Sequence, residues 1–272
     1  MAGSPLSFPA LKDVDLTVNE GEFLGVIGHT GSGKSTLMQH LNGLLLPTGG
    51  HVLVDGLDTL DKKQRVEARK LVGMVFQYPE YQLFEETVKK DVSFGPRNLG
   101  LTEREIDDRA EEAMRLVGLD PERFNEQSPF DLSGGEKRRA ALAGIIAMQP
   151  KYLVLDEPMA GLDPRGRRGI LTLIDSLRKT RNTTIIMVSH SMDDIALSSD
   201  RVLVLNRGSV AFLDTPQAVF SHAEALDGMG LSIPQATKLA LLLKQGGLDA
   251  PADLCTLSAL SNWICRRYQN EH

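Results

Sequence analysis

The stretch Gly28-His29-Thr30-Gly31-Ser32-Gly33-Lys34-Ser35-Thr36 decides the fold of this chain. It fits the pattern G-x-x-x-x-G-K-[S/T], in which the backbone N–H groups of a glycine-rich turn point inward around phosphate oxygens. The apolar run Phe23–Ile27 precedes it and Leu37–Leu41 follows it, as a strand and a helix should in this motif. A glycine-rich turn that binds nothing is the alternative, but the flanking elements argue against it. The sequence therefore predicts a phosphate-binding strand, loop and helix.

The residues of this loop have distinct expected roles. Its glycines keep the turn open, because a Cβ at those positions would obstruct the inward-pointing N–H groups. Lys34 would supply the cation for the β and γ phosphates, and the Ser35 hydroxyl would bind Mg²⁺. The helix that follows adds the favourable positive end of its dipole.

A second functional segment is Tyr152–Pro158, an apolar strand that ends in two adjacent carboxylates, Asp156 and Glu157. In a parallel sheet, ligands collect at the carboxyl ends of the strands, so we expect this pair beside the phosphate loop. Asp156 would hold Mg²⁺ through water, and Glu157 would orient or deprotonate an attacking water. Two acidic residues after a strand are by themselves more often a loop start, but the phosphate loop upstream favours the catalytic interpretation.

The segment Leu132–Glu136 combines a helix start with two glycines. Ser133 and Glu136 form a capping box, and a purely local interpretation ends there. The capping box does not explain Gly134 and Gly135, which expose backbone donors and the positive end of a helix dipole to an incoming anion. We therefore expect a second phosphate contact here.

The rest of the chain alternates between strand and helix patterns. Thr102 and Glu105 form a capping box that opens a helix, and Gly118 stops it. Strands that alternate with helices imply a mostly parallel sheet covered by helices, which is the α/β class. Further predicted elements are strands at Leu16–Val18, Val52–Val54, Tyr152–Leu155 and Thr184–Val188, helices at about Gly135–Met148 and Gly169–Leu177, and a hairpin of Arg201–Leu205 with Ser209–Phe212.

Composition excludes several other classes of protein. The chain has 272 residues and a formal net charge of -6, which disfavours sequence-independent binding to nucleic acid. Its longest apolar run, Ala140–Met148, is far shorter than the ~18 residues that span a bilayer, and no secretory signal is visible. Cys255 and Cys265 lack metal-site spacing, so we interpret them as reduced thiols.

Five segments in this order, covering about residues 11–215, resemble an ABC-type nucleotide-binding subunit. The resemblance implies a P-loop NTPase of the ABC ATPase type, with a mostly parallel sheet core, an antiparallel β subdomain and a helical signature-motif subdomain. We expect residues 1–216 to form the ATPase domain, with the helical subdomain at about 78–150. Residues 217–272 would form a C-terminal helical extension for assembly or dimerisation. The five segments are Gly28–Thr36, Leu132–Glu136, Tyr152–Glu157, Gly161–Asp163 and Ser189-His190.

In that family two ATPase subunits pack head to tail, and each ATP lies between the phosphate loop of one and the Ser-Gly-Gly element of the other. By this resemblance Gln77 senses the γ phosphate and Mg²⁺, Asp163 couples the two sites, and His190 is the switch histidine at the γ phosphate. Each also has a simpler interpretation: an exposed loop amide, a cap before Pro164 and a polar residue at a strand end. The implied catalytic residues are Glu157, His190 and Gln77, the implied Mg²⁺ ligands are Ser35, Gln77 and Asp156, and the implied ATP contacts are Gly28–Thr36, Ser133, Gly134, Gly135 and Asp163.

The segments Phe76–Glu85 and Phe94–Asn98 narrow the resemblance to the ATPase subunits of energy-coupling factor transporters. These import vitamins and, in related systems, cobalt or nickel. The implied partners are a second, identical or paralogous ATPase, a transmembrane coupling protein and small membrane proteins that bind the substrate. The implied location is the cytoplasmic face of the cell membrane, with no nucleic acid bound. Ser128–Gly135 and Gly28–Thr30 look like the second of the two paralogues.

An acidic cluster follows Gln77. A solvated acidic surface is its simplest interpretation. The sharper hypothesis is that it receives basic coupling helices of the membrane partner. The cluster consists of Glu80, Glu85, Glu86 and Asp91.

The N-terminus departs from the family pattern, in which an aromatic residue before the first strand stacks on adenine. Phe8 is the only aromatic residue before Leu11. Met1–Pro5 resembles the middle of the family's first loop. We therefore hypothesise that a first strand and its tyrosine lie upstream of Met1.

The main alternative function is that of a soluble ABC ATPase acting in DNA repair or translation. Such proteins carry a long coiled-coil insertion or two tandem ATPase units, and the sequence shows neither. A module with an inactive site is a weaker alternative, because Lys34, Asp156, Glu157 and His190 are all present.

Overall fold

The computed structural model describes residues 9–270, so Met1–Pro5 and Phe8, on which the N-terminal hypothesis rests, lie outside the described residues. The chain divides into two units. Unit 1 runs to Leu37 and resumes at Met187, and unit 2 comprises Met38–Ile186. The division falls within helix α1 (Lys34–Leu41) and strand β6 (Thr184–Val188).

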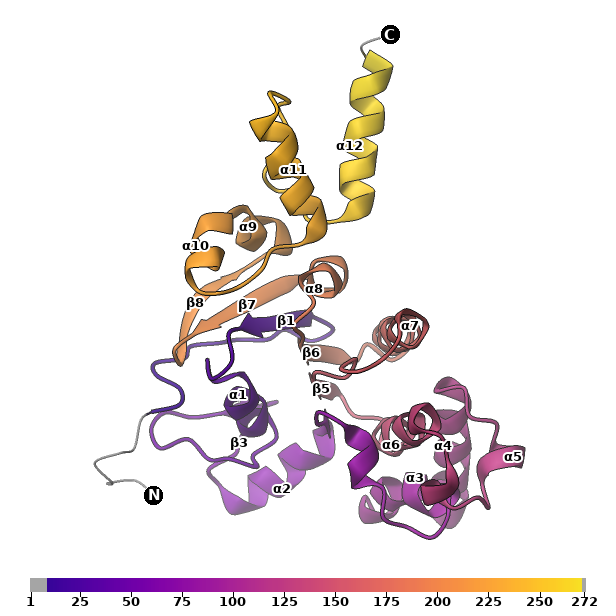
Figure 1. Ribbon diagram of the computed structural model, residues 1–272. Helices are drawn as coiled ribbons and strands as arrows, with labels where there is room; N and C mark the ends of the chain where they lie inside the picture. The colour runs from indigo at the N-terminus through magenta and orange to yellow at the C-terminus, as the bar shows by residue number, and fades with distance from the viewer. Residues whose placement is uncertain (1–8, 271–272) are drawn as a thin grey trace. The chain divides into compact units, whose positions relative to one another are not determined.

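Unit 1 is built on strands β1 (Phe23–Gly28), β7 (Arg201–Asn206) and β8 (Ser209–Asp214), in the order β1-β7-β8 (Figure 1). β1 pairs with β7 in parallel, and β7 with β8 antiparallel. The apolar run that predicts β1 is buried at every position, as expected for a strand covered on both faces. The predicted closing hairpin is confirmed.

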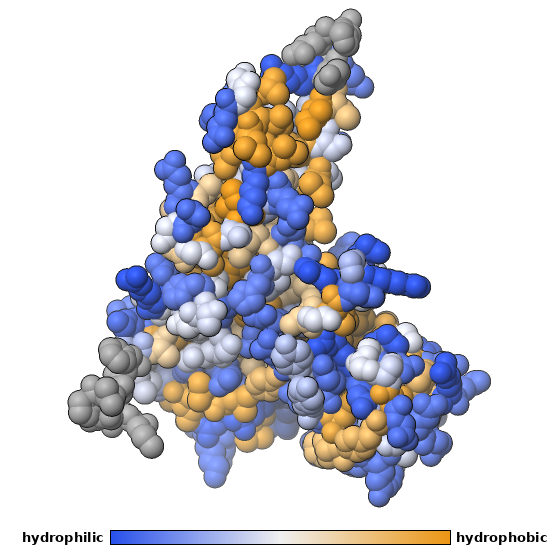
Figure 2. Space-filling model, viewed as in Figure 1, coloured by the Kyte–Doolittle hydropathy of each residue, from blue (hydrophilic) through white to orange (hydrophobic). Residues whose placement is uncertain are grey.

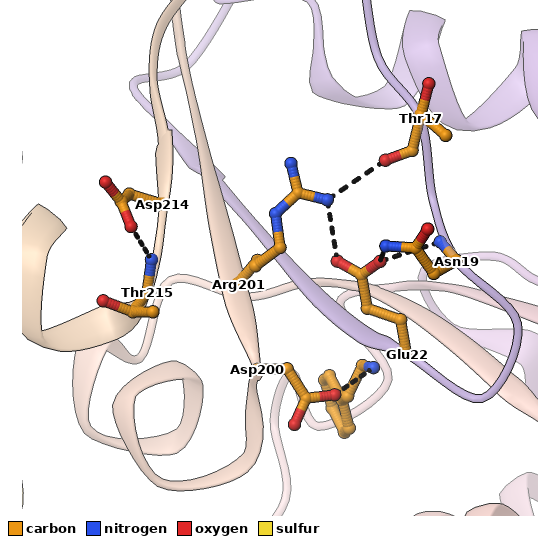
Figure 3. A network of polar contacts seen from close by, with 8 residues as sticks. Thr17, Asn19, Glu22, Asp200, Arg201, Asp214 and Thr215 are labelled. Atoms are coloured by element: carbon orange, nitrogen blue, oxygen red, sulfur yellow. Dashed lines mark hydrogen bonds and ion pairs between the residues drawn. The ribbon is translucent and has the colours of Figure 1, made fainter.

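A polar network fixes the starts of β1 and β7 (Figure 3). The Arg201 guanidinium donates to the Thr17 carbonyl and to the buried carboxylate of Glu22, both at 3.1 Å. The other oxygen of that carboxylate accepts from the backbone and side-chain nitrogens of Asn19. The first N–H of β1 donates to Asp200 at 2.8 Å. Buried charges are stable only when paired in this way, so the network aligns the two strands.

The predicted strand at Leu16–Val18 is wrong. Half-buried and exposed side chains do alternate there, but the described chain has no strand pairing at these residues. Alternation sets only which side chains face inward, whereas a strand also needs a hydrogen-bonded neighbour. The carbonyl of Thr17 instead accepts from an arginine side chain.

Unit 1 continues into helices, as the sequence predicts for the C-terminal extension. Helix α11 packs against α12, and their shared core contains Ala236, Ala240, Ala250 and Leu260 (Figure 1). An apolar patch lies over α11 in this view, with hydrophilic side chains beside it (Figure 2). The helices of unit 1 after β6 are α8 (Met192–Ser198), α9 (Pro216–Ser221), α10 (Ala223–Gly228), α11 (Gln235–Gln245) and α12 (Leu257–Asn270).

Unit 2 contains an antiparallel pair, β2 (Leu53–Val54) with β3 (Leu57–Asp58), and a parallel pair, β4 (Val72–Val75) with β5 (Tyr152–Asp156). The predicted Val52–Val54 strand is thus present in shorter form, and the predicted β5 and β6 are confirmed. The parallel and antiparallel pairings together give the expected α/β class. The helices of unit 2 are α2 (Lys62–Leu71), η1 (Pro79–Gln82), α3 (Val88–Asn98), α4 (Glu103–Leu116), α5 (Pro121–Phe124), η2 (Pro129–Asp131), α6 (Gly134–Ala147) and α7 (Pro164–Arg181).

Helices α3, α4 and α6 pack together into a helical cluster (Figure 1). Both predicted capping boxes, at the starts of α4 and α6, are present. Helix α3 has no counterpart in the sequence predictions, because Gly95 and Pro96 lie within it and are typical helix breakers. A Cβ at Gly95 would lie 2.6 Å from the Met148 side chain, so this glycine allows α3 to approach that residue closely.

Candidate functional site

The phosphate loop of unit 1 is held in a tight turn between β1 and α1. A Cβ at Gly28 would lie 2.4 Å from the Ser32 hydroxyl and 2.5 Å from the Leu205 carbonyl, so only glycine fits there. Gly33 has a φ of 105°, which glycine adopts without steric cost. The loop is fastened to the β7–β8 hairpin by the N–H of Gly208, which donates to the Ser32 carbonyl at 3.0 Å. These glycines and the hydrogen bond to the hairpin therefore fix the geometry of the loop.

Lys34 is buried at the first position of α1. Its ammonium donates to the carbonyls of Gly28 at 2.6 Å and His29 at 3.1 Å, and so reaches back across the loop. The adjacent Ser35 is exposed. The positive charge of Lys34 thus lies within the ring of the phosphate loop, where it can bind an anion.

The carboxylates of unit 2 share one edge of a parallel strand pair with Gln77. β4 and β5 are in register, with Val75 opposite Leu155. Gln77 follows the end of β4 by two residues, and Asp156 and Glu157 follow Leu155 directly. The structure therefore brings these three predicted residues to the carboxyl edge of one strand pair, the expected place for a ligand.

Glu157 occupies an uncommon backbone conformation. Its φ is 53°, in the left-handed region that L-residues with a side chain rarely adopt. The turn continues with the N–H of Ala160, which donates to the Glu157 carbonyl at 3.2 Å. Such conformations cost on the order of 1–3 kcal/mol and cluster at functional sites.

The start of α6 is exposed and its capping is complete. The Glu136 carboxylate accepts from the backbone N–H of Ser133 at 2.9 Å and from its hydroxyl at 2.6 Å. The hydroxyl hydrogen bond is the main reason that the pKa of Glu136 lies below its ordinary value. Gly134 and Gly135 are both exposed, as an anion contact requires.

Asp163 and His190 are also both exposed. Asp163 is the N-cap of α7 and accepts from the Gly166 N–H at 2.7 Å, so the predicted capping role is confirmed. His190 follows β6 after the buried Ser189, and belongs to unit 1 with the phosphate loop. Ser133 and Asp163 belong to unit 2, like Gln77 and the two carboxylates.

The acidic cluster after Gln77 is not a uniform solvated surface. Glu80 forms an ion pair with the buried Arg138. Asp91 accepts from the backbone N–H groups of Phe84 and Glu85, both at 2.9 Å, and burial raises its pKa. Glu80 and Asp91 are thus bonded within unit 2, and Glu86 forms an ion pair with Lys90 on α3.

The sequence predictions missed Arg138. It lies on α6 in line with the buried Leu142 and Ile146, at i, i+4 and i+8. A basic residue on the buried stripe of a helix was the available signal, since an arginine there needs a buried partner.

The donor set suits Mg²⁺. Within unit 2, Asp156 and Gln77 offer side-chain oxygens on one strand edge, and within unit 1 the exposed Ser35 offers a hydroxyl oxygen. Among residues 9–270 no three or more His, Cys, Asp or Glu side chains form a metal cluster. A small number of protein oxygens is typical of Mg²⁺ sites that nucleotide phosphates complete. Within the same described range, no helix combines the length and the apolar character needed to span a bilayer.

Comparison with known proteins identifies the family. The family model for ABC transporters matches residues 11–160. The energy-coupling factor transporter ATP-binding protein EcfA2 of Caldanaerobacter subterraneus subsp. tengcongensis is 51% identical over 265 residues, which cover 97% of this chain and 92% of that protein.

Solved structures of ABC-type ATPases are also similar to this chain. CbiO1 from Clostridium perfringens, described as part of the ABC transporter complex cbiONQ, is 37% identical with a TM-score of 0.72, and the match covers 86% of this chain and 92% of that one. A dimeric post-hydrolysis state of the ATP-binding cassette MJ0796 bound to ADP and Pi is 30% identical with a TM-score of 0.68, covering 76% and 90%. The chain therefore belongs to the ABC transporter family and, within it, to the energy-coupling factor transporter ATP-binding proteins, the ATP-hydrolysing subunits of importers of that type.

Proposed function

We propose that the phosphate loop Gly28–Thr36 binds the phosphates of ATP, with Lys34 at the β and γ phosphates. Ser35, Gln77 and Asp156 would hold Mg²⁺, which when bound neutralises charge on the phosphates. Glu157 would orient the attacking water and accept its proton, while His190 contacts the γ phosphate. The single observation that supports this proposal most is the common edge shared by Gln77, Asp156 and Glu157.

We propose that two ATPase subunits act together. Ser133, Gly134 and Gly135 of one subunit would contact the ATP that the other subunit holds, and Asp163 would couple the two sites. The dimeric solved relative with bound ADP and Pi supports this arrangement. The apolar surface of the C-terminal extension, residues 217–272, with exposed Leu242 and Leu257, would add to assembly. Residues 1–216 would form the ATPase domain, with its helical subdomain at about 78–150.

We propose that the segment after Gln77 receives basic helices of a transmembrane coupling protein, which would hold the chain at the cytoplasmic face of the membrane. Its exposed aromatic side chains include Tyr81, which is 84% exposed, and Phe84, which packs edge-on against Phe94. Such aromatic groups are typical of interfaces. Glu85 adds negative charge beside them, and Glu86 forms an ion pair with Lys90 there. Separate small membrane proteins would select the cargo, a vitamin or related micronutrient, cobalt and nickel included.

The site assignment is tested by Lys34→Ala and Glu157→Gln. Lys34→Ala should weaken ATP binding by about tenfold or more, because it removes charged hydrogen bonds to phosphate. Glu157→Gln should retain ATP binding and lose turnover by about 100-fold or more, because it removes a general base. The two effects are measured as equilibrium binding of ATP and steady-state ATP hydrolysis by the complex purified with a tag on this chain.

Lys62→Ala and Glu122→Gln are the matched controls, because both side chains are exposed outside the site and outside the C-terminal extension. The controls should hydrolyse ATP normally. A Glu157→Gln complex with the wild-type hydrolysis rate would overturn its assigned role.

Partner docking is tested by the double charge reversal Glu85→Lys/Glu86→Lys. It should reduce co-purification of membrane proteins with the tagged chain. The new lysines would repel the basic helices proposed to dock there. The control is Glu103→Lys/Asp108→Lys on α4, which adds the same charge elsewhere. Mass spectrometry of all co-purified chains provides the readout, and unchanged recovery with the first variant would refute this docking surface.

A further inference from the structure

Arg138 is the buried charged residue of helix α6, with 4% of its surface exposed. Its guanidinium donates to both carboxylate oxygens of Glu80, from Nε at 3.1 Å and from Nη2 at 3.2 Å. The remaining nitrogen, Nη1, donates to the carbonyl of Ala160 at 2.7 Å. The same group lies over the Tyr78 ring, 5.9 Å from its centroid. One side chain therefore links three separate segments of unit 2.

Each of these segments carries residues of the proposed site. Glu80 lies in η1, which begins two residues after Gln77. Arg138 itself lies in the first two turns of the helix that Ser133 caps. Ala160 ends the turn that begins at Glu157. The bidentate fork of arginine fixes angle as well as distance, so these segments are held in one geometry.

The backbone at two of these segments is strained. Tyr78 has a φ of 58° and Glu157 a φ of 53°, both in the left-handed region. Residues in such conformations persist only when surrounding contacts hold them. Arg138 contacts the ring of Tyr78 and the carbonyl that lies three residues after Glu157, so its contacts hold both turns.

We propose that Arg138 is a positioning residue for hydrolysis, which fixes the turn carrying Glu157 relative to η1 so that a displacement of η1 moves that turn. The proposal rests on the catalytic role proposed for Glu157. Arg138 contacts neither nucleotide nor water in this role. It acts through Glu80 on one side and the Ala160 carbonyl on the other.

The test compares three substitutions in the purified complex. Arg138→Lys keeps the charge but cannot engage both Glu80 oxygens and the Ala160 carbonyl in the same geometry. Glu80→Gln keeps the shape and removes the partner charge, and Arg138→Met removes the guanidinium. The expected result for Arg138→Lys is a fall in kcat of about tenfold, with KM and ATP affinity changed by less than about twofold. Arg138→Met combined with Glu80→Gln should lose less than the product of the two single losses, because both changes break one linkage.

Arg115→Met is the matched control, because it breaks the exposed ion pair with Glu111 on α4 and touches no site segment. Thermal unfolding is measured for every variant. A purely structural role would lower Tm without separating kcat from KM. If Arg138→Met fails to fold, Arg138→Lys and Glu80→Gln still decide the question.

A folded Arg138→Lys complex with unchanged kcat would overturn the inference while leaving ATP hydrolysis established. If Glu157→Gln also left hydrolysis unchanged, the proposed catalytic site would be wrong, which is a different outcome.

Discussion

Helices α4 and α6 begin in the same way, yet only one of them is expected to bind a ligand. In α4 the Glu105 carboxylate accepts from the Thr102 N–H at 2.9 Å and from its hydroxyl at 2.7 Å. In α6 the corresponding distances from Ser133 to Glu136 are 2.9 and 2.6 Å. In both helices the N–H three residues after the cap donates back to the hydroxyl at 3.4 Å. Capping alone therefore does not distinguish them.

The difference lies in the two residues between cap and carboxylate. They are Glu103 and Arg104 in α4, but Gly134 and Gly135 in α6. Apart from the chain neighbours and the backbone of α6 itself, no atom of the described residues would lie within 4 Å of a Cβ at Gly134. By the same measure, the nearest atom to a Cβ at Gly135 would be in the Arg139 side chain, 3.8 Å away. Neither glycine is required by the packing of this chain. The space beside these glycines is open, as the proposed contact with ATP requires.

The largest effect is expected from giving these two positions of α6 side chains. Gly134→Ala/Gly135→Ala should leave the free energy of unfolding unchanged or raise it by up to about 1 kcal/mol, because alanine favours helix. ATP hydrolysis should nevertheless fall by about tenfold or more, because two methyl groups would obstruct the phosphate contact. Chemical denaturation and steady-state hydrolysis of the complex measure the two quantities.

Glu103→Gly/Arg104→Gly is the control for that change. It should lower the free energy of unfolding by about 1 kcal/mol and leave hydrolysis intact. Normal hydrolysis by the alanine variant would mean that the glycines of α6 have no role in the site.

A smaller effect is expected from removing each capping hydroxyl. Ser133→Ala and Thr102→Ala should each cost about 1 kcal/mol of stability, since each removes an N-cap. Only Ser133→Ala should also reduce ATP hydrolysis. Equal hydrolysis by the two variants, measured alongside their unfolding, would contradict the idea that Ser133 contacts nucleotide.

The smallest effect concerns pH, and here the two helices should behave alike. Hydrogen bonds from the Thr102 and Ser133 hydroxyls are the main cause of the lowered pKa values of Glu105 and Glu136. A lowered pKa means that each carboxylate stabilises the fold at pH above its ordinary value of 4.5, and that this contribution is lost as the pH falls through the lowered pKa.

Glu105→Gln and Glu136→Gln should therefore each lower Tm slightly at pH 7. At the acid end of the range, the Tm of each variant should be close to that of the wild type. Thermal unfolding across the acid range checks this expectation. A Tm difference that stays constant with pH would show that ionisation of these carboxylates does not contribute.

The elements that the sequence predicts correctly are those whose signals are local. The phosphate loop, the two capping boxes and the β7–β8 hairpin each depend on residues close together in the chain. Helix α3 was missed because Gly95 and Pro96 oppose helix formation locally, and only packing beside Met148 overrides them. The Leu16–Val18 strand was wrongly predicted because strand pairing depends on a neighbour that the local pattern cannot supply.

The same distinction applies to the site. The phosphate loop, the adjacent carboxylates Asp156 and Glu157 and the capped glycine pair Gly134-Gly135 could be predicted because each is a short motif. The ion pair of Arg138 with Glu80 joins residues 58 positions apart, and no pattern of nearby residues specifies it. The position of Arg138 on a buried helix stripe predicts that it needs a partner, but only the fold identifies that partner as Glu80.

At position 157 the left-handed backbone makes stability to heat and catalytic turnover depend on the residue in opposite ways. Glycine adopts this conformation at no steric cost, so a directed-evolution campaign that selects survivors of heating alone is expected to enrich glycine there. Those variants would be thermostable but would lack the proposed catalytic carboxylate. Any engineering of this chain for durability should therefore hold position 157 constant and select for turnover in every round.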